Sequence, residues 1–151
     1  MHKARLYLDT SVMSAYLDDR APDRQRLTHQ FWSERLSAFE VVISPLVVSE
    51  IAGTPDPARR KQLTELATDF EVIPMTAEAT ALAEAYLAQG VFPAHYRSDA
   101  LHVAVAVIHG CSYLGSWNFK HLVRVRTRRE VNLINALRGH QPIEIVAPPE
   151  L

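Results

Sequence analysis

Apolar residues in this chain fall into short runs that alternate with longer, periodic segments. The first run, "RLYLD" at residues 5–9, is largely apolar at both alternating sets of positions, which is typical of a strand covered on both faces. Similar runs predict strands at residues 40–44, 70–75 and 112–116 and in the final segment "PIEIV". Between the runs, apolar residues recur with the helical period. We expect helices at residues 12–18, 24–38, 45–52, 57–68, 76–89, 99–109 and 128–138.

Residues that favour helix ends flank most of these segments. The expected caps are Thr10 or Ser11, Asp23, Ser44 followed by Pro45, Ser98, and a capping box from Thr127 to Glu130. The expected stops are Gly53, Gly90, Gly110 and Gly139. This alternation of strands and helices predicts an α/β fold, a three-layer α/β/α sandwich with a mostly parallel central sheet.

Polar side chains follow several of the predicted strands. Asp9 ends the first strand, Ser44 and Glu50 follow the second, and Asn118 follows the fourth. Parallel sheets of this kind bind ligands beyond the carboxyl ends of their strands. The functional site is therefore expected at that edge.

Composition and charge narrow the class of protein. A length of 151 residues predicts one domain spanning residues 1–151, and 48% apolar with 22% charged residues is typical of soluble globular proteins. The net charge of −1 argues against a broadly basic surface, so any nucleic-acid contact must come from a local patch. The single cysteine, Cys111, allows no internal disulfide, fits a cytoplasmic protein and reads as a small buried hydrophobe. We expect no signal peptide and no membrane span.

Two acidic residues occupy positions where apolar residues are expected. Glu50 shares a helical face with Leu46 and Val47, and that face should be buried, unless Glu50 lies at its edge and reaches water. Asp99 opens an almost wholly apolar helix. It either complements the helix dipole or faces the region on which the strands converge.

Together with Asp9, these acids predict a metal site. Three carboxylates gathered in one pocket would repel one another and raise each other's pKa values. A hard divalent cation relieves that repulsion, and carboxylate and water oxygens select Mg²⁺ or Mn²⁺. We therefore interpret Asp9, Glu50 and Asp99 as metal ligands.

Four short motifs carry a resemblance to a known family. In order and spacing, "LDTSV", "SEI", "SDALHVA" and "LGSWNFKHL" resemble the motifs of PIN-domain nucleases, and most closely those of VapC-type toxins from toxin–antitoxin pairs. The resemblance implies an α/β/α sandwich and a Mg²⁺- or Mn²⁺-dependent endoribonuclease. It further implies a homodimer and a small antitoxin partner. It matches Asp9, Glu50 and Asp99 to the first three family acids.

The fourth motif departs from the family pattern, because Asn118 stands where another acid is usual. An amide oxygen can still bind a cation or a water, but the lost charge favours a one-metal site. Thr10 and Ser11 match the first motif, where a hydroxyl either holds Asp9 or serves only as a cap. His102, three residues after Asp99, either faces the same pocket or is a satisfied core residue, and Trp117 is expected to pack in the core rather than stack on a base.

The implied reaction is hydrolysis of RNA phosphodiesters by a metal-activated water. Asp9 and Asp99 would be the main ligands, and Glu50 would ligate the ion or orient the water as a base. Such a reaction leaves a 5′-phosphate and a 3′-hydroxyl.

A basic segment follows Asn118. Its cations are Lys120, Arg124, Arg126, Arg128 and Arg129. Arg128 and Arg129 are expected in the first turn of a helix, where positive charge is disfavoured, so an anionic partner would stabilise them. That partner is RNA or an acidic antitoxin segment, and the alternative is an ordinary solvated face.

Other functions fit less well. A haloacid-dehalogenase-like phosphatase needs a second acid at position 11, and a response-regulator receiver needs an aspartate at the end of the third strand; both are missing. The alternative that stays open is a PIN-fold module that binds RNA or protein without catalysis, which Asn118 supports. The three acids oppose it, because binding alone does not require like charges to converge.

Overall fold

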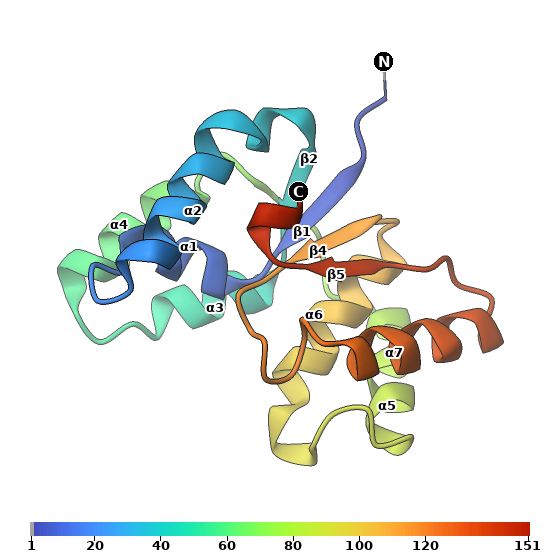
Figure 1. Cartoon of the computed structure of the whole chain (residues 1–151). Helices are drawn as coiled ribbons and strands as arrows, with labels where there is room; N and C mark the ends of the chain where they lie inside the picture. The colour runs from blue at the N-terminus through green and yellow to red at the C-terminus, as the bar shows by residue number, and fades with distance from the viewer. Residues whose placement is uncertain (1) are drawn as a thin grey trace.

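Parallel strands form the centre of the molecule. The computed structural model describes residues 2–151, and within that range five parallel strands form one sheet in the order β3-β2-β1-β4-β5 (Figure 1). The strands are β1 (Arg5–Leu8), β2 (Glu40–Ile43), β3 (Glu71–Val72), β4 (Tyr113–Gly115) and β5 (Glu144–Val146). The predicted parallel sheet is confirmed, although β3 is shorter than the expected run over residues 70–75.

Helices cover both faces of this sheet, which confirms the α/β/α sandwich. The α-helices are α1 (Thr10–Leu17), α2 (Pro22–Glu34), α3 (Pro45–Ala52), α4 (Pro57–Ala67), α5 (Ala77–Ala88), α6 (Arg97–Ile108) and α7 (Val125–Leu137). Helices α1, α2 and α4 pack together on one side, and α5, α6 and α7 lie on the other (Figure 1). None of the helices between residues 2 and 151 has the length and hydropathy needed to cross a bilayer.

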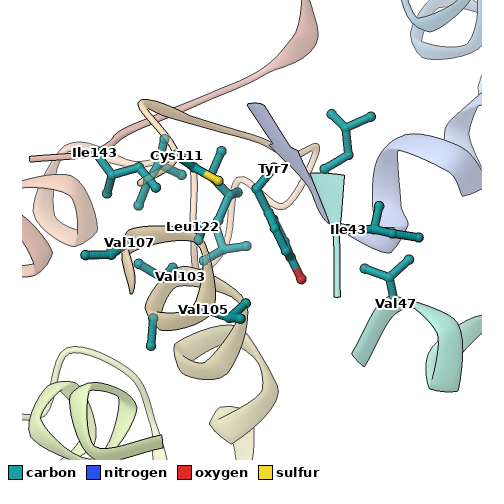
Figure 2. Packing of buried hydrophobic residues seen from close by; sticks show 14 of the residues in the cluster. Tyr7, Ile43, Val47, Val103, Val105, Val107, Cys111, Leu122 and Ile143 are labelled. Carbon is teal, nitrogen blue, oxygen red and sulfur yellow. The ribbon is translucent and has the colours of Figure 1, made fainter. Parts of the chain in front are cut away.

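The core lies around β1, the middle strand. Leu6, Tyr7 and Leu8 are all fully buried, as expected for a strand covered on both faces. Figure 2 shows the Tyr7 ring extending from β1 between Val105 of α6 and Ile43 of β2, with its hydroxyl at the far end. Tyr7 therefore brings a polar atom into the interior.

Helix α6 is buried almost all round, as its apolar sequence predicts. Two other expectations of burial are confirmed. Cys111 is 4% exposed, and burial raises the pKa of its thiol to about 12. Trp117 is 7% exposed and its indole N–H donates to Thr28 Oγ1 at 2.9 Å, so it packs in the core.

Several helix starts differ from the prediction. Asp9, not Thr10 or Ser11, caps α1, because its carboxylate accepts the backbone N–H of Ser11 at 3.1 Å. Helix α2 begins at Pro22, whose fixed φ suits the first helical position, so Asp23 lies in the first turn and does not cap. It also ends at Glu34, before the expected residue 38.

The capping predictions for α6 and α7 are wrong as well. Helix α6 begins at Arg97, directly after a 3-10 turn, so Ser98 lies inside it. Helix α7 begins at Val125, and Thr127, expected to open a capping box, is buried and donates to the carbonyl of His121 at 2.8 Å. The Thr127 hydroxyl is therefore engaged by the loop that precedes α7 and does not cap the helix.

Other end signals are confirmed. Ser44 caps α3, accepting the N–H of Leu46 at 3.2 Å, and Pro45 takes the first helical position. Gly90, Gly110 and Gly139 have φ of 74°, 75° and 78°, the left-handed region in which a side chain is strained.

Candidate active site

Asp9 lies at the carboxyl end of β1 and is held by hydroxyl groups. It is 5% exposed, and its Oδ1 accepts the Ser11 hydroxyl at 2.5 Å while its Oδ2 accepts the Ser116 hydroxyl at 2.6 Å. Burial raises the pKa of Asp9, against the opposing effects of the His102 charge and these two hydroxyls. The Ser11 hydroxyl therefore holds Asp9 and does not cap the helix.

Ser116 is a site residue that sequence reasoning did not single out. It follows β4, the strand beside β1, and the pairing of Leu8 with Gly115 sets Ser116 next to Asp9. Its Oγ also accepts the N–H of Asn118 at 2.9 Å. The signal was a serine at the carboxyl end of a predicted strand, but strand order was needed to place it beside Asp9.

Glu50 lies on α3 at the rim of the site rather than in the core. Val47 on the same helix is fully buried, but the Glu50 side chain is 40% exposed, so the expected burial is wrong. The buried face of α3 is narrow enough that Glu50 lies at its edge. Its Oε1 accepts both the Thr10 hydroxyl at 2.7 Å and His102 Nε2 at 2.9 Å.

His102 joins the core to the site. It is 3% exposed; its Nε2 contacts Glu50, and its Nδ1 lies 2.6 Å from Tyr7 Oη. Burial lowers the pKa of His102, but the hydrogen bond to Glu50 and the nearby carboxylates outweigh burial, and the net shift is upward. Burial likewise raises the pKa of Glu50, and the contacts with His102 and Thr10 turn that shift downward.

Asp99 lies one turn before His102 on α6 and is half-buried. Burial raises its pKa to about 6; the charges of Asp9 and Glu50 add to that effect, and His102 opposes it. The three acids are therefore close enough to influence one another's ionisation.

Asn118 lies beside the group but its amide faces a local turn. Its Oδ1 accepts the N–H of His121 at 3.0 Å, and its backbone N–H donates to Ser116. The residue thus stabilises the loop that carries Ser116.

The basic segment is partly engaged within the protein. Arg126 pairs with Glu130 at 3.1 Å, Arg128 donates to the carbonyl of Ile145 at 3.3 Å, and Arg124 donates to the carbonyl of Lys120 at 3.0 Å. Helix α7 begins at Val125, so Arg128 lies in its first turn, as predicted, together with Arg126. Arg129 lies in the next turn, so the prediction is wrong for that residue.

The donor set suits a hard divalent cation. Between residues 2 and 151, no three His, Cys, Asp or Glu side chains already stand at the spacing of a metal cage. The acids that influence one another's pKa values are all carboxylates, which bind Mg²⁺ or Mn²⁺ directly or through water. The chemistry of these donors therefore suits such an ion.

Comparison with solved structures supports the fold. A toxin–antitoxin complex from Klebsiella pneumoniae is 18% identical, with a TM-score of 0.60 over 81% of this chain and 93% of that one. VapC20 of Mycobacterium tuberculosis, described as a Sarcin-Ricin loop cleaving toxin, is 18% identical, with a TM-score of 0.57 over 77% and 92%. DNA-bound VapBC from Salmonella typhimurium is 17% identical, with a TM-score of 0.58 over 96% and 98%.

At these identities the likeness is one of fold, and no curated protein matches the sequence. The family itself comes from a sequence model described as PIN domain, which matches residues 6–125. That match takes in Asp9, Glu50 and Asp99 together with the loop that carries Ser116 and Asn118. The chain belongs to the PIN domain family.

Proposed function

We propose that this protein is a metal-dependent endoribonuclease and the toxin of a type II toxin–antitoxin pair, of the VapC type. The observation that carries the proposal is the grouping of Asp9, Glu50 and Asp99. Asp9 directly follows β1, and Glu50 and Asp99 lie on α3 and α6. The pKa of Asp99 is raised chiefly by burial, and the charges of Asp9 and Glu50 add to that effect. A structural role alone gives no reason to gather like charges in one pocket.

Each residue of the site has a role in this proposal. Asp9 and Asp99 would hold Mg²⁺ or Mn²⁺, and the hydroxyls of Ser11 and Ser116 fix the Asp9 carboxylate. When bound, such a cation would neutralise charge at phosphate and acidify water. Glu50 orients the attacking water and takes its proton, and its lowered pKa keeps it in the ionised form that a base requires.

RNA approaches the site along its basic rim. The side chains of Lys120, Arg124 and Arg129 are exposed, and their charges can meet phosphates. Arg126 and Arg128 hold Glu130 and Ile145 and contribute less to RNA binding.

An antitoxin and a second copy of the chain are the proposed partners. The similar solved structures include VapBC complexes, and α7 exposes Val125, Leu133 and Leu137 at 60%, 61% and 77%, an apolar row suited to a protein contact. We further propose that residues 1–151 form one domain and that the protein acts in the cytoplasm.

A second candidate function is a PIN-fold module that binds RNA or protein without cleaving. Two observations favour it: the amide oxygen of Asn118 already accepts the N–H of His121, and within residues 2–151 the acids do not stand at ready-made metal spacing. The grouped carboxylates favour the nuclease.

Cleavage assays separate the two functions. Purified protein is incubated with a structured RNA with and without Mn²⁺, beside an Asp9→Asn variant. The nuclease gives Mn²⁺-dependent products with a 5′-phosphate and a 3′-hydroxyl, and the variant gives none. Binding without cleavage would favour the second candidate, and 2′,3′-cyclic phosphate ends would exclude attack by water.

A further inference from the structure

A continuous line of hydrogen bonds leads from the core to Glu50. Ser44 Oγ lies 2.7 Å from Tyr7 Oη, and Tyr7 Oη lies 2.6 Å from His102 Nδ1. On the other side of the imidazole, Nε2 lies 2.9 Å from Glu50 Oε1. Ser44 and Tyr7 are fully buried and His102 nearly so, which removes water as a competing partner.

The groups at the ends determine the direction of each hydrogen bond. A carboxylate only accepts, so His102 Nε2 carries the proton that faces Glu50. When the ring is neutral, Nδ1 is then an acceptor, and it accepts a hydrogen bond from the Tyr7 hydroxyl. Ser44 Oγ accepts the N–H of Leu46 and donates its own proton to Tyr7 Oη. Every donor in the line then has an acceptor.

The same line joins the elements that carry the acids. Tyr7 stands two positions before Asp9 on β1, and Ser44 caps the helix that carries Glu50. His102 stands one turn after Asp99 on α6. The hydrogen bonds therefore tie β1, α3 and α6 together directly beneath their carboxylates.

We propose that Tyr7 and Ser44 are positioning residues that act through His102: they fix the imidazole so that its Nε2–H holds Glu50 Oε1, leaving the other carboxylate oxygen for the reaction. The kinetic consequence rests on the proposed nuclease function, whereas the hydrogen-bond line is testable without any activity. Partners that orient the residues of a metal site in this way change activity by about 10- to 100-fold when removed.

A matched pair of tyrosine variants tests the role. Tyr7→Phe removes the hydroxyl that contacts His102, and Tyr86→Phe removes an equally buried hydroxyl that donates to Asn135 Oδ1 on α7. We expect Tyr7→Phe to lower kcat for RNA cleavage at least about 10-fold with KM nearly unchanged, and Tyr86→Phe to leave both within about twofold.

A double variant then shows whether Tyr7 acts through the imidazole. In a His102→Gln background the hydroxyl has no ring nitrogen to orient, so adding Tyr7→Phe should lower kcat no further. An equal loss in both backgrounds would overturn the proposal, as would a Tyr7→Phe enzyme that matches Tyr86→Phe.

The ring nitrogens give a readout that does not depend on cleavage. Long-range ¹H–¹⁵N spectra report which ring nitrogens carry protons, and the His102 signals are assigned by their loss in His102→Gln. They should show Nε2 protonated in the wild type. The His102 signals should change in Tyr7→Phe but not in Tyr86→Phe. A wild-type ring protonated only at Nδ1, or a pattern that Tyr7→Phe leaves unchanged, would overturn the proposal. If the wild type cleaves no RNA yet shows the expected spectra, the nuclease function fails while the hydrogen-bond line stands.

Discussion

Within residues 2–151, the groups that donate hydrogen bonds to the Asp9 carboxylate are neutral, and none is an arginine. The Ser11 N–H, the Ser11 hydroxyl and the Ser116 hydroxyl all point to its carboxylate. Neutral donors orient a carboxylate but leave its charge uncompensated. A buried aspartate held in this way remains available to a cation, which a salt-bridged one would not.

Ser116 should matter to both stability and activity. Ser116→Ala leaves Asp9 Oδ2 without its hydroxyl donor, and loss of a hydrogen bond to a charged group costs about 1.5–3 kcal/mol. We expect denaturant unfolding to show a loss of that size and RNA cleavage to fall about 10-fold.

Ser112→Ala is the matched control, because Ser112 precedes the same strand but is exposed. It should change the free energy of unfolding by less than about 0.5 kcal/mol. A Ser116→Ala protein as stable and active as this control would show that the hydroxyl does not support Asp9.

Asp99 should destabilise the metal-free protein. Its pKa is raised from 3.8 to about 6, so between those values the folded state binds more protons than the unfolded state and stability falls as pH rises. Asp99→Asn removes this loss. At pH 7.5 without divalent cations the variant should be about 1–2 kcal/mol more stable than the wild type, since partial exposure weakens the effect of a shift worth about 1.4 kcal/mol per pKa unit.

The gain should shrink towards pH 4, where the wild-type carboxyl is protonated in the folded state and about half protonated in the unfolded chain. Urea unfolding at pH 4, 6 and 7.5 with chelator measures it. A variant less stable than the wild type at all three values would show that folding does not raise the pKa of Asp99.

The strands and most helices follow from apolar periodicity, but their boundaries do not. Ser44 and Pro45 predicted the start of α3 because the cap is local. The capping box predicted from Thr127 is wrong, because the Thr127 hydroxyl donates to the carbonyl of His121 and does not cap the helix. Local patterns locate elements, but the same polar residue can cap a helix or bond to the loop before it, so the pattern alone does not determine where a helix begins.

The acids of the site were predictable and their supports were not. Asp9 ends an apolar strand and Asp99 opens an apolar helix, so both stand out in the sequence. Ser116 and Tyr7 are ordinary residues of a loop and a strand, and they meet their partners only across 107 and 95 positions of chain. Glu50 was singled out because it shares a helical face with apolar residues. Apolar periodicity does not distinguish a residue at the edge of such a face from one at its buried centre.

Helix α7 should distinguish RNA-binding arginines from structural ones. Arg129 is exposed, whereas Arg128 holds the carbonyl of Ile145. Arg129→Ala should reduce the slope of log affinity against log salt by about 0.7, as expected for one lost contact to single-stranded RNA. Fluorescence anisotropy with labelled RNA and chelator measures the slope.

Arg20→Ala serves as the comparison, because Arg20 is 88% exposed in the turn between α1 and α2. It should leave the slope unchanged. If Arg129→Ala behaves like Arg20→Ala, α7 does not lie on the RNA path.

The order of the sheet assembles the site. Because β1 is the middle strand, its carboxyl end lies between β2, which leads into α3, and β4, which leads to Ser116. Helix α6 packs against the same centre and adds Asp99 and His102. Residues from four distant parts of the chain therefore meet at one edge, the place where parallel sheets bind ligands.

Mn²⁺ binding, measured by isothermal titration calorimetry, tests the central claim that the three carboxylates form one cation site. The wild type should bind Mn²⁺, and Asp9→Asn, Glu50→Gln and Asp99→Asn should each weaken binding at least about 10-fold. Glu78→Gln, which alters an exposed carboxylate in the first turn of α5, should bind as the wild type does. Wild-type protein that binds no Mn²⁺, or site variants that bind it as tightly as Glu78→Gln, would contradict the account.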